Sequence, residues 1–377
     1  MSIVLDAMGS DNFPHPEVDA AFQAATELDI TIYLVGQRER LEPLIAQKPE
    51  DPRVVLVHAP EILEMGDKPA RNARRKADNS MAIGMDLVKE GKADAFVTAG
   101  NTGGAVIQKL VTRQQNVCAL VHRPEQAALL EQLGVQESII GNLADRATME
   151  TAVVGAQAVY HLCPNMHPQE LKIGQAAIRA AQSAGVERFV YHSVLHPQVE
   201  IMAHHWQKMR VEEQLFESGL SFTILQPAAY MQNVLTNWDR IFKQGLYTVP
   251  YALDTRLSMV DLMDVAEVAA KVLVEAGYEG AIYELCGAEI VTQREIANIL
   301  AEQLGRRVRA EVVAIETWEQ NARSAGLSDY AVEALAKMFQ YYERFGFWGN
   351  SQVLGWLLGR APTTFADFLE RTVDAQA

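Results

Sequence analysis

The sequence predicts an α/β fold with a parallel β-sheet, and three observations support this prediction. Short apolar runs rich in β-branched residues alternate with longer amphipathic stretches, which is typical of strands that alternate with helices. The stretch AFVTAGNTGGAVIQKLVTRQ sets a glycine-rich loop between an apolar strand and a helix. After about residue 245 the spacing of the runs changes, which indicates a smaller mixed lobe.

The first quarter of the chain predicts one series of strands and helices. We expect strands at Ile3–Leu5, Thr31–Val35, Val54–Val57 and Ala95–Thr98, with helices over 17–28, 37–46 and 69–90.

A second series of strands begins with that same segment, 95–98. It continues with Val117–Val121, Ser138–Ile140, Ala158–Leu162, Arg188–His192 and Phe222–Leu225. A strand has only two edges, so both sheets cannot form fully around one strand unless they merge. We expect the second sheet to hold the shared strand and the first series to pack less well.

The last third of the chain predicts the mixed lobe, with an aromatic and helical end over 328–371. Thr292 and Glu295 have the spacing of a capping box at the start of a helix. Aromatic side chains near the C-terminus could form a substrate wall or a core, and the core is favoured: Tyr341, Tyr342, Phe345, Phe347 and Trp348. We therefore predict a partial α/β unit over 1–92, a parallel-sheet domain over 93–245 and a C-terminal lobe over 246–377.

The net charge of −15 argues against a nucleic-acid partner, because an acidic surface repels phosphate backbones. The basic cluster at 71–76 is either a solvated helix face or an anion site. No run approaches the roughly 18 apolar residues of a membrane span. The N-terminus lacks the pattern of a signal peptide, so a cytoplasmic protein is expected.

Cysteine and histidine spacing gives no metal motif. Cys118, Cys163 and Cys286 are far apart without CxxC spacing, which argues for a reducing compartment and against a zinc site. Four histidines have no acidic ligand beside them in a recognisable motif, so no metal is expected there: His192, His196, His204 and His205.

The glycine loop predicts a dinucleotide-binding unit of Rossmann type. Glycines let the backbone approach a pyrophosphate, and the following helix offers free N–H groups and a positive dipole end. His122 and Arg123 follow the next strand, about twenty residues after the loop, where an NAD-binding unit carries an acid. A basic pair suits a 2′-phosphate, so NADP is favoured over NAD. The alternative is that Arg123 is an ordinary surface arginine.

The first hundred residues resemble a known family. LDAMGSD, EMGDKPARNARRKADNSM and KADAFVTAGNTGG resemble, in order and spacing, the PlsX phosphate acyltransferases over residues 1 to about 104. That family makes acyl-phosphate for phospholipid synthesis, from phosphate and the acyl group carried as a thioester on acyl carrier protein. The resemblance implies a site at Asp6, Lys68, Ser80 and Asn101, with the basic cluster holding phosphate or an acidic partner. About two hundred further residues of that family are not recognisable after Gly104.

The remainder, 95–377, resembles the NmrA-like branch of atypical short-chain dehydrogenases. The resemblance rests on ALVHRPEQ, GNLADRATMETAVVGAQAVYHLCP, AGVERFVYHSV, FTILQPAAYMQN and MVDLMDVAEVA. It implies Gly100, Asn101, Thr102 and Gly103 at the pyrophosphate, His122 and Arg123 at the 2′-phosphate, Asn142 and Leu143 near the adenine, and Cys163 and Pro164 beneath the nicotinamide. The loop departs from the family's three glycines: Val97 takes the place of the first, or the loop is two residues short. This departure is expected to weaken cofactor binding.

The same resemblance implies catalytic residues. Hydride transfer needs a proton donor near the accepting oxygen. Short-chain dehydrogenases use a serine and a Tyr-x-x-x-Lys helix, whose spacing puts both side chains on one face. Here Ser193 follows a strand, His204 takes the tyrosine position and Lys208 the lysine position. Tyr230 and Asn233, in and after the turn QPAAYMQN, are expected to meet substrate.

Three functions follow from these patterns. We favour an NADP-dependent reductase of a small carbonyl or quinone-like substrate. The rival enzyme is the phosphate acyltransferase, with acyl carrier protein as partner only if the N-terminal part is active. The non-enzyme alternative is a sensor of the NADP redox state. A homodimer is left open.

Overall fold

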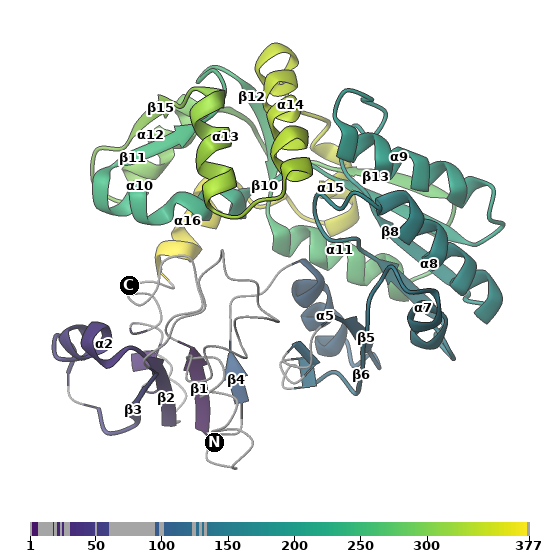
Figure 1. The fold of residues 1–377 in the computed structure, drawn as a ribbon, viewed down its shortest axis with the longest axis horizontal. Coiled ribbons are helices and arrows are strands. Elements are labelled where there is room, and N and C mark those ends of the chain that lie inside the picture. Colours follow the sequence, from purple (N-terminus) through teal and green to yellow (C-terminus); the bar gives the residue numbers. More distant parts are fainter. Residues whose placement is uncertain are drawn as a thin grey trace. The chain divides into compact units, whose positions relative to one another are not determined.

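The computed structural model describes residues 2–6, 18, 21–22, 25, 31–49, 51–59, 95–97, 102–122, 126–127, 130–131 and 134–374. The chain divides into two compact units. The first comprises residues 1–100 and the end of the chain from Glu370, and the second is Asn101–Leu369. Each unit contains parallel β-structure with helices (Figure 1), so the predicted α/β class is confirmed.

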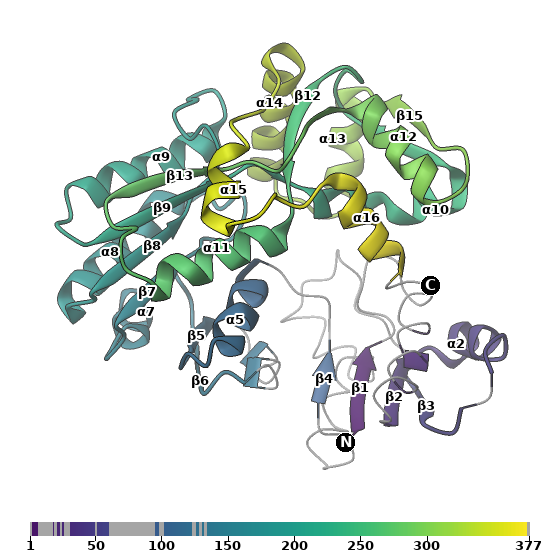
Figure 2. The same cartoon turned by 180° about the vertical axis from the view of Figure 1, so that it is seen from behind.

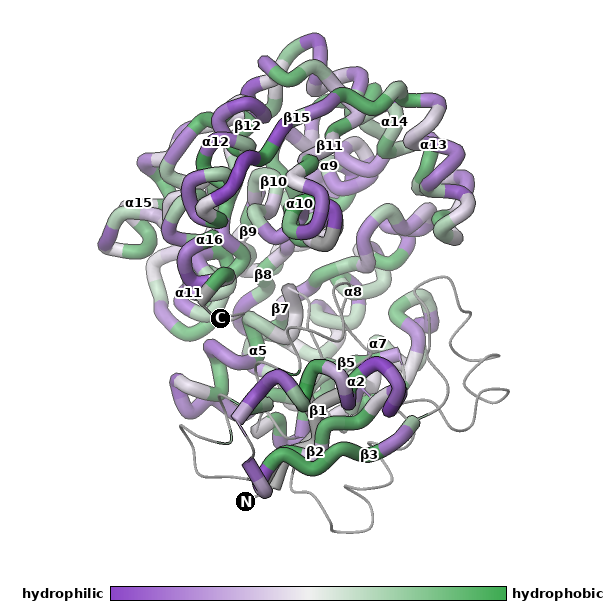
Figure 3. The backbone as a smooth tube through the Cα atoms, turned by 90° about the vertical axis from the view of Figure 1, so that its left-hand side faces the viewer, coloured by the Kyte–Doolittle hydropathy of each residue, from purple (hydrophilic) through white to green (hydrophobic). Residues whose placement is uncertain are grey.

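The first unit holds a four-stranded sheet in the order β3-β2-β1-β4, and its three strand pairs are all parallel. The strands are β1 (Ser2–Asp6), β2 (Thr31–Gly36), β3 (Val54–His58) and β4 (Ala95–Val97). β2 and β3 are largely apolar along their length (Figure 3), as is typical of strands in parallel sheets. The four predicted strands of the first series are therefore confirmed.

A small core lies against β2. Leu34 of β2 is fully buried together with Leu41 of α2 (Arg38–Ile45). Val18, Ala21 and Ala25 are buried in the same cluster, at a helical spacing of three and four residues. These residues support the helix predicted over 17–28, whereas the helix predicted over 69–90 lies outside the described residues.

The shared strand corrects one prediction. Residues 95–97 were expected in the second sheet, but β4 pairs with β1 in the register Val4↔Phe96, so that expectation is wrong. The physical reason is the open edge of β1: β2 occupies one of its edges, and β4 satisfies the backbone groups of the other.

The second unit contains a parallel sheet in the order β13-β9-β8-β7 and, among its described strands, a separate parallel pair β5-β6. The strands are β5 (Cys118–Val121), β6 (Glu137–Ile140), β7 (Ala158–His161), β8 (Arg188–His192), β9 (Phe222–Pro227) and β13 (Ala281–Leu285). The strands predicted for the second series all form. In a nucleotide-binding sheet of order 3-2-1-4-5-6, strand 1 separates strand 2 from strand 4. No described strand of this unit fills that position between β5 and β7.

Helices cover this sheet. They are α5 (Thr102–Thr112), α7 (Arg146–Ala152), α8 (Glu170–Ala184), α9 (Ala203–Phe216) and α11 (Leu262–Val274). Phe189 and Tyr191 of β8 are fully buried in the cluster that contains Val211 of α9. Gly174 lets α8 and α9 approach closely, because a Cβ there would lie 2.6 Å from both methyl carbons of Val211. The view from behind shows α8 and α9 side by side along the sheet (Figure 2).

The rest of the described chain is mixed, as predicted for its part over 246–377. Its strands are β10 (Ala229–Tyr230), β11 (Leu246–Val249), β12 (Arg256–Val260), β14 (Ile290–Thr292) and β15 (Arg309–Val312). Its helices are η1 (Met231–Asn237), α10 (Trp238–Gln244), α12 (Gln293–Gln303), α13 (Ile315–Ser324), α14 (Asp329–Phe345), α15 (Gln352–Leu358) and α16 (Phe365–Asp374). The capping box of Thr292 and Glu295 is confirmed at the start of α12. Among the described helices, none is both long and apolar enough to cross a membrane.

Candidate active site

The residues predicted to hold a cofactor lie at the carboxyl ends of strands and at one helix start. Thr102 and Gly103 begin α5. His122 follows β5 and is exposed, and Asn142 and Leu143 follow β6. Gly100, Asn101 and Arg123 lie outside the described residues. Ligands of open α/β sheets bind at this edge, so the described part of the set stays the predicted cofactor site.

Cys163 and Pro164 follow β7 and differ in exposure. Cys163 is 3% exposed, whereas Pro164 is exposed. Burial raises the pKa of the Cys163 thiol, with a further contribution from the nearby carboxylate of Glu170. The thiol is therefore neutral near pH 7 and suits packing rather than nucleophilic attack.

Lys208 forms a buried ion pair near the ends of β7 and β8. Its Nζ lies 2.9 Å from Oε1 of Glu170, and the two side chains are 12% and 4% exposed. The same Nζ donates to the backbone carbonyl of His192 at 3.4 Å, and the Tyr191 hydroxyl donates to Glu170 at 3.0 Å. The last residue of β8 and the first turn of α8 are thereby joined to α9 through one lysine.

His204 lies one helical turn before Lys208 on α9, as the motif requires. Its ring is buried and contacts His205 edge-on, with ring centroids 4.4 Å apart. Burial lowers the pKa of His204 to about 4, with a smaller effect from Lys208. Its Nδ1 is enclosed and has no hydrogen-bond partner among the described residues.

Ser193 points into a different network. Its hydroxyl donates to Glu212, whose carboxylate also accepts two hydrogen bonds from Gln226 Nε2 at 2.9 and 3.0 Å. Ser193 and Glu212 are each 2% exposed. The structure thus brings Lys208 and His204 together on one helix and engages the Ser193 hydroxyl elsewhere.

One well-connected polar group was considered from the sequence only as a metal ligand. His192, the last residue of β8, accepts or donates at both ring nitrogens: Nδ1 bonds to the Tyr160 hydroxyl, and Nε2 lies 2.8 Å from the Tyr230 hydroxyl. The side chain of Thr102 also acts on the Tyr230 hydroxyl and lowers its pKa. Tyr230 was predicted to meet substrate and Thr102 to meet cofactor, so the structure joins these two predictions. A sequence signal existed, since His192 ends a strand of a parallel sheet.

The described histidines, cysteines and acids form no group of three or more that could hold a metal ion. Asn233, the second residue expected near substrate, is exposed on η1, and its backbone carbonyl accepts from the Thr236 hydroxyl at 2.8 Å.

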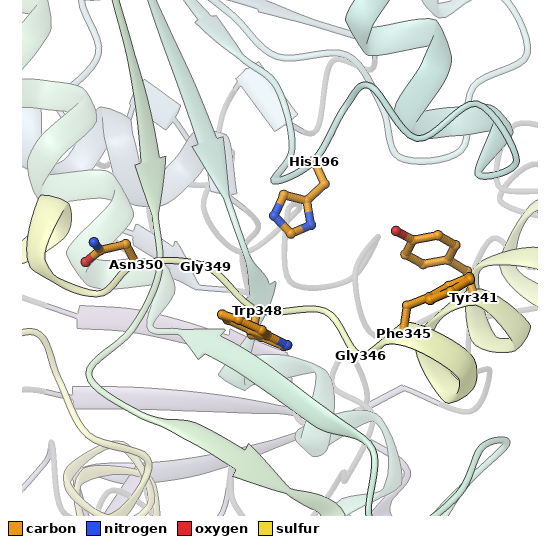
Figure 4. A pocket seen from close by; sticks show the side chains of 7 residues that line it. All are labelled: His196, Tyr341, Phe345, Gly346, Trp348, Gly349 and Asn350. Atoms are coloured by element: carbon orange, nitrogen blue, oxygen red, sulfur yellow. The ribbon is translucent and has the colours of Figure 1, made fainter.

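An open pocket of about 580 Å³ lies in the C-terminal lobe and the loop after β8 (Figure 4). Its lining residues are His196, Tyr341, Phe345, Gly346, Trp348, Gly349 and Asn350. The aromatic residues of the lobe fall into two groups, one buried in the core and one exposed at the pocket. Tyr342 and Phe347 are buried and stack with centroids 4.5 Å apart, whereas Phe345 and Trp348 are exposed at the pocket.

Of the residues implied by the acyltransferase resemblance, the structure describes one. Asp6 ends β1, at the carboxyl edge of the first sheet. Lys68, Ser80 and Asn101, with the basic cluster at 71–76, lie outside the described residues.

The class of protein defined by these features is an α/β protein of Rossmann type, with polar side chains gathered at the carboxyl ends of parallel strands. Comparison with known families gives the particular family. The NmrA-like family model matches residues 95–374, and the chain belongs to the NmrA-like family.

Relatives of this region carry names of reductases. An NAD(P)H azoreductase of Xenophilus azovorans is 27% identical over 271 residues, which are 71% of this chain and 93% of that protein. Quinone oxidoreductase 2 of Escherichia coli is also 27% identical, over 71% of this chain and 94% of that protein. A solved structure of an NADPH-dependent quinone oxidoreductase from Escherichia coli, in complex with NADPH, has a TM-score of 0.65 at 26% identity. The match covers 73% of this chain and 97% of the chain in that structure.

The beginning of the chain matches a second family model, described as fatty acid synthesis protein, over residues 1–140. This match continues past residue 104, where the sequence analysis placed the end of the resemblance. A phosphate acyltransferase of Koribacter versatilis is 44% identical over 133 residues. The matched region is 34% of this chain and 36% of that protein, so the chain spans about a third of this relative.

Proposed function

We propose that this chain is an NADP(H)-dependent reductase of a small carbonyl or quinone-like substrate. The observation that carries the proposal is Lys208, held by Glu170 and the His192 carbonyl at the carboxyl ends of β7 and β8. That edge of a parallel sheet is where α/β proteins bind their ligands. The relatives named as NAD(P)H azoreductase and quinone oxidoreductase support the reaction class.

A second observation supports the binding of a dinucleotide by the described residues. Nδ1 of His204 and Nε2 of His161 are buried without a hydrogen-bond partner among the described residues. The charges of Lys208 and Glu170 act on both rings. Buried polar atoms of native proteins are usually paired, so two unpaired nitrogens around one lysine suit the polar groups of a ligand.

The residues that would hold the cofactor are those of the sequence prediction: Gly100, Asn101, Thr102, Gly103, His122, Arg123, Asn142, Leu143, Cys163 and Pro164. When bound, NADPH supplies a hydride. Lys208 would bind ribose hydroxyls, and Glu170 would keep its Nζ in position. Tyr230 and Asn233 would contact substrate.

The first test is a thermal-shift titration with NADPH and NADH. A ligand at about 100 times its Kd stabilises the folded protein by about 2.7 kcal/mol. We expect stabilisation by micromolar NADPH and less by NADH, because His122 and Arg123 suit a 2′-phosphate. Equal shifts with both cofactors would contradict the NADP preference, and no shift with either would contradict the proposal.

The second test is turnover of NADPH with a panel of quinones and small carbonyls. In Lys208→Ala we expect kcat/KM to fall by about 100-fold or more, because a group that positions the reactants is lost. Lys172→Ala is the matched control, since Lys172 is an exposed lysine on α8. Equal activity of the two variants would exclude a role for Lys208.

A second candidate function rests on the 44% identity of the beginning of the chain to a phosphate acyltransferase. If that part is active, the chain transfers the acyl group of acylated acyl carrier protein to phosphate, which forms acyl-phosphate and releases the carrier thiol. Release of the carrier thiol with matching acyl-phosphate formation would support it. NADPH binding without turnover of any acceptor would instead support a redox sensor. A cytoplasmic location and a homodimer stay predictions.

A further inference from the structure

Four polar side chains form a continuous row in the second unit. Tyr160 of β7 bonds to Nδ1 of His192, Nε2 of His192 lies 2.8 Å from the Tyr230 hydroxyl, and the Thr102 side chain acts on that hydroxyl and lowers its pKa. The row runs from the interior of one strand, across the end of the next, to the first residue of the helix that follows the glycine loop.

The sheet explains why Tyr160 and His192 meet. Side chains alternate between the faces of a strand, and registered partners of parallel strands share a face. His161 is paired with Tyr191, and their rings stack with centroids 5.8 Å apart on one face. Tyr160 and His192 are each one residue away and lie on the other face, where Tyr230 reaches them from β10.

The hydrogen bonds give the row a direction. A neutral imidazole has one N–H donor and one acceptor nitrogen. One tyrosine therefore donates to His192 while the other accepts from it. Burial, with a smaller effect from Lys208, lowers the pKa of His192 to about 3, so the ring is neutral near pH 7. A proton can then pass only by gain at one nitrogen and loss at the other, without a lasting cation.

The two tyrosines that flank His192 are more exposed than His192 itself. His192 is 4% exposed, whereas Tyr160 and Tyr230 are half-buried. Burial raises the pKa of the Tyr230 phenol, and the side chain of Thr102 opposes this only in part. Tyr230 is therefore protonated near pH 7, as a proton donor must be. The Nδ1 of His204, the donor implied by its place in the motif, has no hydrogen-bond partner among the described residues that could replace a lost proton.

We propose that Tyr230 is the catalytic proton donor of the reductase, and that His192 and Tyr160 replace the proton it gives up. The inference rests on the proposed function. As hydride adds to the substrate carbonyl carbon, the Tyr230 O–H bond breaks and its proton binds the substrate oxygen. The Tyr230 oxygen takes the proton from Nε2 of His192, Nδ1 takes that of Tyr160, and Tyr160 takes a proton from water, which leaves hydroxide. Before the next turnover the ring returns to its first tautomer: Tyr230 passes its proton to Nε2 and takes one from a water in the emptied site, and Nδ1 releases its proton through Tyr160 to the hydroxide.

The test compares Tyr230→Phe and Tyr160→Phe with the control Tyr283→Phe, which alters a half-buried tyrosine of β13 in the same sheet. General acid catalysis is worth about 100- to 10,000-fold, so kcat of Tyr230→Phe should fall within that range while its NADPH affinity is kept. Tyr160→Phe should lose less, about tenfold in kcat, because it removes a residue that replaces the proton and leaves the donor itself in place. In a proton inventory the wild type should show several protons in flight and Tyr160→Phe fewer.

A spectroscopic readout tests His192 independently of turnover. In protein labelled with ¹⁵N-histidine, the His192 ring should stay neutral at pH 6, with one tautomer preferred. Tyr160→Phe and Tyr230→Phe should shift that tautomer in opposite directions, because each removes the partner of a different nitrogen. A charged ring at pH 6, or ring shifts unchanged in both variants, would overturn the relay.

Two outcomes separate this proposal from the proposed function. A wild type that turns over NADPH, with a Tyr230→Phe variant of equal kcat, would overturn the relay alone. In that case a large loss in His204→Gln would return the donor role to His204. A wild type that binds NADPH but reduces no acceptor would overturn both.

Discussion

The two units of this chain use the same kind of strand with different results. In the first unit, four consecutive positions of a parallel sheet are filled, and β4 completes the edge next to β1. In the second unit, the described strands form the pair β5-β6 and the sheet β13-β9-β8-β7, with no described strand between β5 and β7. Residues 95–97 fit the strand pattern of both sheets, and in the structure they complete the sheet of the first unit.

The difference teaches that local pattern does not decide which sheet a strand joins. Residues 95–97 are apolar and β-prone in either context, and both family models include them. Their partner depends on which open edge offers a matching row of backbone donors and acceptors. Helix α5 follows this strand in sequence and belongs to the second unit, so the unit boundary falls at the glycine loop.

The largest effect is expected from a disulfide cross-link within the first sheet. Val4→Cys with Phe96→Cys, in a Cys118→Ser background, should form a disulfide in high yield. These residues are registered partners, and parallel neighbours lie within the usual Cα separation of about 4.4–6.8 Å. The control Val4→Cys with Val97→Cys shifts the register by one residue and turns the thiols to opposite faces. Equal yields from the two pairs would show that β4 is not held against β1.

The next prediction uses acid, because buried histidines with lowered pKa lie in the second unit. Burial lowers the pKa of His161 and His204 to about 4 and of His192 to about 3, against an unfolded value near 6.5. Between these values the unfolded chain binds more protons. The stability that these rings contribute is thus complete above pH 6.5 and is lost as the pH falls toward 4. Each ring contributes a slope of up to about 1.4 kcal/mol per pH unit.

Urea unfolding at several pH values between 7 and 4.5 would measure this slope. The transition of the second unit should move to lower urea as the pH falls. In His161→Asn, the pH dependence of the free energy of unfolding should decrease by the contribution of one titrating ring. A transition of the second unit that does not depend on pH would show that these rings are solvated in the folded state.

A smaller effect is expected from the buried ion pair. Glu170→Ala leaves Lys208 buried without its carboxylate and should destabilise the second unit by about 3–5 kcal/mol. Glu213→Ala is the matched control, because it breaks the exposed Arg210–Glu213 pair on α9. The control should cost at most about 1 kcal/mol. Similar losses in both variants, measured by urea unfolding, would mean that water reaches the Glu170–Lys208 pair.

Much of the architecture could be predicted from the sequence. The strands of both series follow from short β-branched runs, and the helix start at Thr292 follows from a capping box whose contacts span three residues. The position of His204 one turn before Lys208 follows from the 3.6-residue period of a helix. These features depend on neighbours in sequence, so the sequence by itself determined them.

Only the tertiary structure decided which distant groups meet. The pairing of β4 with β1 joins residues about ninety positions apart, and the His192 contacts join β7, β8 and β10. The Ser193 hydroxyl was expected beside Lys208, but it donates to Glu212 from a buried position. Such contacts depend on strand register, on the face each side chain takes and on competition for open edges. None of these is encoded by the residue types of one segment alone.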